Sequence, residues 1–117
     1  MKKIIALIFV MAMCSTMFAQ QVASGKYLLT ASSPGYTLHA NSGDRSVTLE
    51  VTFAVPFEKK PEIIVTVSQM EASNETRLRY HAIASAISRD GFVLTVKTWG
   101  DTKLLSVGGS WIAVSGK

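Results

Sequence analysis

The stretch Gly91-Phe92-Val93-Leu94-Thr95-Val96-Lys97-Thr98-Trp99 decides the fold of this chain. Its side chains fall into two alternating sets, one of them mainly apolar, and a period of two is expected for a strand half buried against a core. A short polar loop follows, and the second tryptophan, Trp111, lies in the last strand-like run. An aromatic residue near a strand end can pack in a core or support a ligand, so the role of each tryptophan is the central question.

Most of the remaining chain also has the sequence pattern of strands. Alternation covers residues 47–53, a β-branched run covers 63–67, and a final strand is expected over 109–114. Residues 71–75 are predicted to form a loop, and Asp90-Gly91 provides hairpin-turn chemistry. Residues 76–87 alternate as a strand would, although their alanines also permit a helix from 79 to 87. These patterns predict an all-β fold, a six-stranded antiparallel β-sandwich in a single domain over residues 20–117.

The amino terminus has the pattern of a signal peptide. Lys2 and Lys3 precede an apolar run, and small residues follow up to Ala19, after which we expect cleavage. A membrane anchor is the alternative, but the run is shorter than the ~20 residues that a spanning helix needs. A lipoprotein would be acylated at Cys14, where Met13 occupies a position that favours a small residue. We therefore expect residues 1–19 to be removed, a secreted or periplasmic protein, and no membrane span after cleavage.

Composition excludes several classes of protein. Removing 19 of the 117 residues leaves 98 with no cysteine, and the net charge falls from +4 to +2 as Lys2 and Lys3 leave. The basic residues are scattered, which disfavours nucleic-acid binding. His39 and His81 are far apart in sequence, so we expect no metal and no cofactor. A small exported domain without disulfides relies on its core or on association with copies of itself.

Several short motifs occur in an order and at a spacing that resemble one family, the H-type lectin domains of snail agglutinins and of the carboxyl-terminal domain of discoidins. These motifs are Ser24-Gly25-Lys26, Val51-Thr52-Phe53, Pro56-Phe57, Pro61, Arg77-Leu78-Arg79, Gly91-Phe92, Thr98-Trp99-Gly100-Asp101-Thr102 and Trp111-Ile112-Ala113. The resemblance implies a six-stranded sandwich that assembles as a homotrimer. It also implies binding of galactose or N-acetylgalactosamine between neighbouring protomers.

The resemblance also assigns roles to particular residues. Arg79 matches an arginine that contacts sugar hydroxyls, for which the planar guanidinium is suited, and Trp99 matches the tryptophan before the ligand loop. Each also has a plainer interpretation, Arg79 as a solvated or ion-paired residue and Trp99 as a core or interface aromatic. This chain has Gly100 where the agglutinins carry histidine, and Leu105 where they carry tyrosine. Both differences remove contacts on which specificity for N-acetylgalactosamine depends.

Acidic residues complete the set of candidates. Asp101 is a possible acceptor in place of the missing side chains, or it caps the turn beside Thr102. In the family an acidic residue comes from the neighbouring protomer, and Asp44 is the nearest candidate, with Gly43 offering backbone groups beside it. The stretch around them is also ordinary turn composition.

Two functions follow from this sequence. The first is a carbohydrate-binding protein that recognises galactose-type glycans through several equivalent sites. The second is a structural or assembly module that keeps the sandwich without sugar recognition, an alternative favoured by Gly100 and Leu105. No paired carboxylates and no nucleophile with a base stand out, so we expect no enzymatic activity.

Overall fold

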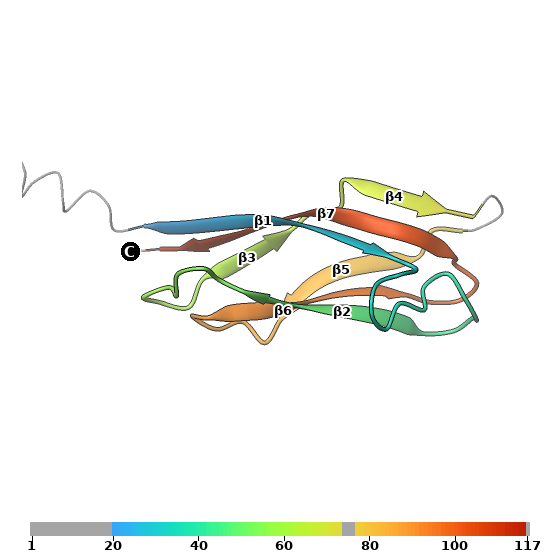
Figure 1. The fold of residues 1–117 in the computed structure, drawn as a ribbon, viewed down its shortest axis with the longest axis horizontal. Helices are drawn as coiled ribbons and strands as arrows, with labels where there is room; N and C mark the ends of the chain where they lie inside the picture. The colour runs from blue at the N-terminus through green and yellow to red at the C-terminus, as the bar shows by residue number, and fades with distance from the viewer. Residues whose placement is uncertain (1–19, 74–76, 117) are drawn as a thin grey trace, which may run out of the picture.

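The structure, a computed structural model, describes residues 20–73 and 77–116. The predicted signal peptide lies outside the described residues. Within those two ranges the chain forms seven strands, arranged in two antiparallel sheets that face each other (Figure 1). The expected all-β antiparallel sandwich is therefore confirmed, with seven strands in place of six. None of the described residues belongs to a helix long and apolar enough to cross a membrane.

The first sheet is organised around one long strand. This strand, β7 (Leu104–Ser115), pairs from Ser106 to Ser115 with β1 (Gln21–Thr30) on one side. Its other side pairs with β3 (Glu62–Val65) and then with β4 (Gln69–Ala72). The second sheet has the order β2 (Arg45–Thr52), β6 (Gly91–Thr98) and β5 (Tyr80–Ser85).

Two strand predictions need correction, and one ambiguity is resolved. Glu71 and Ala72 belong to β4, not to a loop, because β7 offers them an edge to pair with. β7 begins at Leu104 and not at Gly109, since pairing with β1 and β4 carries the strand through two glycines that weaken its own propensity. Residues 80–85 form a strand and not a helix, paired with β6. Residues 74–76, at the end of the predicted loop and the start of the ambiguous segment, lie outside the described residues.

The core lies between the sheets and contains an aromatic cluster. β6 buries Phe92, Leu94, Val96 and Thr98, as its alternation predicts. Trp111 is 8% exposed, and its ring centroid lies 5.3 Å from that of Phe92 and 5.8 Å from that of Phe53. Trp111, in the last strand, is therefore a core residue.

Trp111 fits because its strand partner has no side chain. Gly25 of β1 faces Trp111 of β7 in register. A β-carbon at Gly25 would lie 2.7 Å from the indole ring, closer than van der Waals contact allows. The glycine of the Ser24-Gly25-Lys26 motif therefore leaves space for the largest side chain of the core.

Candidate functional site

Three segments meet at the end of the sandwich where β6 passes into β7. They are the loop before β2, residues 77–79 before β5, and the 99–103 turn that crosses from one sheet to the other (Figure 1). The N–H of Gly43 donates to the carbonyl of Gly100 at 2.8 Å, and the N–H of Leu104 donates to the carbonyl of Leu38 at 2.9 Å. The loop before β2 is thus fixed to both ends of the turn.

Arg45, at the start of β2, organises this junction. Its side chain is buried, and its guanidinium donates to four carbonyl oxygens, those of Leu38 at 3.3 Å, Ala40 at 2.9 Å, Gly43 at 3.0 Å and Gly100 at 3.1 Å. A buried guanidinium needs such partners because desolvation of an unpaired charge is costly. Sequence analysis did not single out Arg45. The alternation of the strand could have identified it. Arg45 lies an even number of residues from Val47, Leu49 and Val51, so its side chain is on the same inward face of β2.

Thr102 connects the turn to the segment before β5. It is fully buried, and its hydroxyl oxygen accepts a hydrogen bond from the N–H of Arg79 at 3.1 Å. The same hydroxyl donates to the carbonyl of Arg77. One side chain therefore sets where the backbone of Arg79 lies relative to the turn.

Arg79 extends across the turn and pairs with Asp101. Its Nη1 lies 2.7 Å from Oδ1 of Asp101, and the two side chains are 33% and 72% exposed. The hydrogen bond from Arg79 lowers the pKa of Asp101 below its ordinary value, with help from a backbone hydrogen bond. Asp101 thus both pairs with Arg79 and accepts a backbone hydrogen bond.

Gly100 lies beneath this ion pair. Its φ of 70° is in the left-handed region that favours glycine, and a β-carbon there would lie 3.2 Å from Nη1 of Arg79. A β-carbon at this position would require the end of the Arg79 side chain to move by a few tenths of an ångström. The left-handed backbone at Gly100 is therefore the stronger reason for glycine here.

Trp99 follows β6 directly and is 37% exposed, in contrast to the buried Trp111. Its ring centroid lies 5.8 Å from that of His81 on β5, at an interplanar angle of 44°. Trp99 is therefore not a core residue. Trp99 follows Thr98, and Arg79 precedes Tyr80, the register partner of Thr98, so the exposed ring belongs to the strand end beside the Arg79 segment.

Gly43 and Asp44 lie across the turn from these residues. The β2–β6 register pairs Arg45 with Thr98, and its continuation through the Gly43–Gly100 hydrogen bond places Asp44 opposite Trp99. Oδ2 of Asp44 lies 3.5 Å from Nζ of Lys97, with both side chains exposed. Within this chain, the structure therefore gathers Gly43, Asp44, Arg79, Trp99, Gly100 and Asp101 at one end.

Leu105 is separated from this group by the architecture. It lies in β7, in the other sheet, and not in the loop after Trp99. The β4–β7 register shifts between Glu71 and Ala72, so Leu105 is the extra residue of a bulge, and its side chain is 41% exposed. Leu105 is therefore a strand residue, because strand pairing begins at Leu104.

Comparisons with known proteins agree with this architecture. The H-type lectin domain model matches residues 48–114. A protein of Fuscovulum blasticum named "ATP synthase subunits region ORF 7" is 32% identical over 89 residues, which is 76% of this chain and 77% of that protein.

Two solved structures of discoidin II from Dictyostelium discoideum share the fold. Recombinant discoidin II has a TM-score of 0.73 over 84% of this chain, and the wild-type protein has a TM-score of 0.75 over 86%. Both are 22% identical in sequence to this chain, which spans 38% of the discoidin II chain. With the family model covering more than half of its residues and a sandwich of the same fold, the chain belongs to the H-type lectin domain family.

Proposed function

We propose that this protein is a non-enzymatic lectin that binds galactose- or N-acetylgalactosamine-type glycans. The observation that carries the proposal is the Arg79–Asp101 pair over Gly100, beside the exposed ring of Trp99. Membership of the H-type lectin domain family supports carbohydrate binding in general. The particular sugar and the residues that contact it are part of the proposal.

The chemistry of the pair suits a polyhydroxylated ring. The guanidinium offers several donors in one plane, while the carboxylate of Asp101 accepts, so neighbouring sugar hydroxyls find both kinds of partner. The ring of Trp99 provides an apolar surface for the C–H face of a galactose-type sugar. In this arrangement Asp101 supplies polar contacts that the agglutinins obtain from histidine.

Self-association is the second part of the proposal. Large apolar side chains are exposed on β5 of the second sheet and just before it, with Ile83 at 47% and Leu78 at 57%. Exposed apolar patches are typical of surfaces that bind other proteins. We propose a homotrimer in which each glycan site is completed by a neighbouring protomer, with Asp44 and Gly43 contributed across the contact. Several weak sites on one particle raise apparent affinity by ~10²–10⁴ when they engage one surface.

The location of the protein is the third part. We propose that residues 1–19 direct export and that the protein acts outside the cytoplasm, as a secreted or periplasmic lectin in glycan recognition or cell adhesion. The supporting observation is the basic, apolar and small-residue order of this segment. The cleavage site is tested by mass spectrometry of the exported protein, for which we expect Gln20 as the first residue.

A glycan array tests binding directly. We expect the purified protein to bind galactose-type glycans and Arg79→Ala to lose that signal while keeping its oligomeric state in light scattering. Arg89→Ala is the matched control, because Arg89 lies in the turn before β6 at the other end of the sandwich. A well-folded trimer with no array signal would refute the lectin proposal.

That outcome would support a structural or assembly module as the second candidate function. One observation favours it, namely that Arg79 already has an intramolecular partner in Asp101. A monomer at micromolar concentration would contradict the trimer in both candidates.

A further inference from the structure

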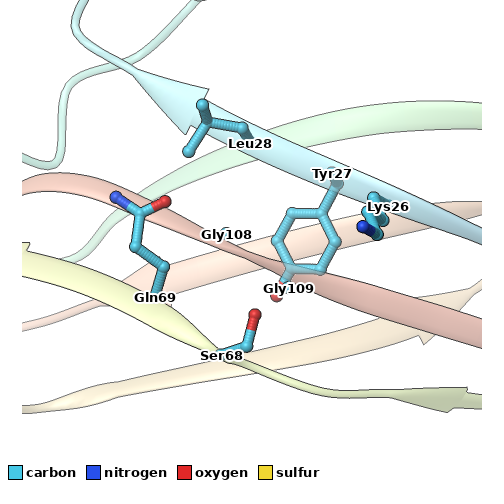
Figure 2. A pocket seen from close by; sticks show the side chains of 7 residues that line it. All are labelled: Lys26, Tyr27, Leu28, Ser68, Gln69, Gly108 and Gly109. Atoms are coloured by element: carbon cyan, nitrogen blue, oxygen red, sulfur yellow. The ribbon is translucent and has the colours of Figure 1, made fainter.

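A pocket of about 350 Å³ opens on the first sheet, which is not the sheet that carries Arg79 and Trp99 (Figure 2). Ligand pockets range upward from ~300 Å³, so this one has room for a ligand of monosaccharide size. The residues that line it come from β1, β7, the start of β4 and the residue before β4. They are Lys26, Tyr27, Leu28, Ser68, Gln69, Gly108 and Gly109.

Gly108 forms part of the pocket floor. In register it lies between Leu28 of β1 and Gln69 of β4, both of which are exposed. A β-carbon at Gly108 would lie 3.0 Å from Cδ1 of Leu28, 3.3 Å from Oε1 of Gln69 and 2.9 Å from the carbonyl oxygen of Tyr27. The two flanking side chains therefore converge over a position that only glycine fills without a shift.

An irregularity between β3 and β4 supplies a second polar group. The N–H of Ser68 donates to the carbonyl of Gly108 at 2.9 Å, although Gln69 is the register partner of the same glycine. Two consecutive residues, Ser68 and Gln69, thus face one residue of β7. Both side chains are exposed, whereas in a regular strand one of the two would point into the core. Figure 2 shows these two side chains on one side of β7, with Lys26 and Leu28 on the other.

The polar groups of the pocket have defined roles. Nε2 of Gln69 donates to the hydroxyl of Ser106 at 2.9 Å, which leaves Oε1 as an acceptor beside Gly108. The hydroxyl of Ser68 both donates and accepts. Tyr27 is fixed below by its hydroxyl, which donates to the carbonyl of Thr66 at 2.8 Å.

Charge and apolar surface narrow the class of ligand. Lys26 is the one charged residue among the seven that line the pocket, so the charge there favours an anion. Leu28 is 57% exposed and offers a surface for ring C–H groups. We propose that this pocket is a second saccharide site that takes a carboxylate-bearing sugar unit, with the carboxylate toward Lys26 and the hydroxyls toward Gln69 and Ser68.

Nuclear magnetic resonance of ¹⁵N-labelled protein tests this proposal, with galacturonate as the probe and galactose as its neutral counterpart. We expect galacturonate to shift the amide signals of Ser68, Gln69, Gly108 and Gly109, and galactose to shift them much less. Lys26→Gln should weaken galacturonate binding by about ten-fold, the loss expected for a charge-assisted hydrogen bond. Lys59→Gln, which removes another exposed lysine outside the pocket, should leave it unchanged.

The experiment can distinguish failure of the pocket proposal from failure of the proposed lectin site. Arg79→Ala should not change the galacturonate shifts, so either site can fail alone. The proposal would be overturned if galacturonate left the amide signals of the pocket unshifted. It would also be overturned if both sugars shifted them equally and Lys26→Gln did not change those shifts. Shifts that follow protein concentration without any sugar would also overturn it, because another copy of the chain would then cover this face.

Discussion

The guanidinium of Arg79 and the carboxylate of Asp101 lie 2.7 Å apart, on segments separated by 22 residues. Gly100 lies between them in the turn, and a β-carbon there would be 3.2 Å from Nη1 of Arg79. The ion pair occupies the surface of the turn that connects β6 to β7.

The ion pair predicts how glycan binding depends on pH. Because Arg79 lowers the pKa of Asp101 below 3.8, the pair is intact above that value and is lost as the pH falls through the lowered pKa. We expect constant binding from about pH 7 down to about pH 4, measured by calorimetry with a galactose-type ligand. Asp101→Asn should weaken binding at neutral pH and remove the acid-dependent loss. A midpoint near neutral pH in the unmodified protein would instead implicate a histidine.

Thr102 is predicted to position Arg79 through its hydroxyl. Thr102→Val keeps the shape but leaves the N–H of Arg79 and the carbonyl of Arg77 without this partner. We expect a loss of about 1–3 kcal/mol in the free energy of unfolding, measured in urea, together with weaker glycan binding. Thr102→Ser retains the hydroxyl and is the control for binding. If valine and serine bind glycan equally well, the hydroxyl has no positioning role.

Arg45 is predicted to hold the loop before β2 in place. Arg45→Met removes the donor to four carbonyls, and we expect a loss of about 1–3 kcal/mol in unfolding free energy. Hydrogen exchange gives a local readout, since the N–H of Gly43 should lose protection as its contact with Gly100 loosens. Arg89→Met, a change of the same size in another turn, should leave the exchange of Gly43 unaltered. Unchanged protection in Arg45→Met would contradict this role.

Gly25 is predicted to be required by the packing of Trp111. Gly25→Ala places a methyl group 2.7 Å from the indole, and overpacking of this kind costs about 1–3 kcal/mol. Thermal unfolding and the emission of Trp111 would report the change, with Trp99→Phe as background to isolate the buried ring. Gly116→Ala is the control, because nothing lies within 4 Å of a β-carbon there. Equal stability of the two alanine variants would refute the packing argument.

Local pattern was enough to predict the sandwich. The alternation of β6 and β2 fixed which side chains face inward, because the period of two depends only on strand geometry. β4 and the first half of β7 were missed for a physical reason. Their pairing comes from neighbouring strands, and the glycines at 108 and 109 carry no propensity signal that a sequence window detects.

The sequence predicted which residues are candidates for the site, but not the contacts between them. Motif order placed Arg79, Trp99 and Asp101 in one region, and the structure brings them together. The ion pair and the hydroxyl of Thr102 depend on contacts across 22 to 25 residues, which no local pattern encodes. The alternation of β2 indicates that Arg45 is buried, but not its hydrogen bond to Gly100, which lies 55 residues away. Leu105 was misplaced because its strand begins earlier than its sequence suggests.

The pairing of β7 with three other strands also limits how the length of this chain can vary. One residue inserted in the middle of β7 would reverse the inward and outward faces of everything beyond it, moving Trp111 from the core to the solvent. Residues 58–60, in the connection from β2 to β3, are exposed and belong to no strand, so a change in length there leaves every register intact. Insertions and deletions should therefore be found in that connection and not in β7, and a library of single-residue insertions scored for folding would show the difference.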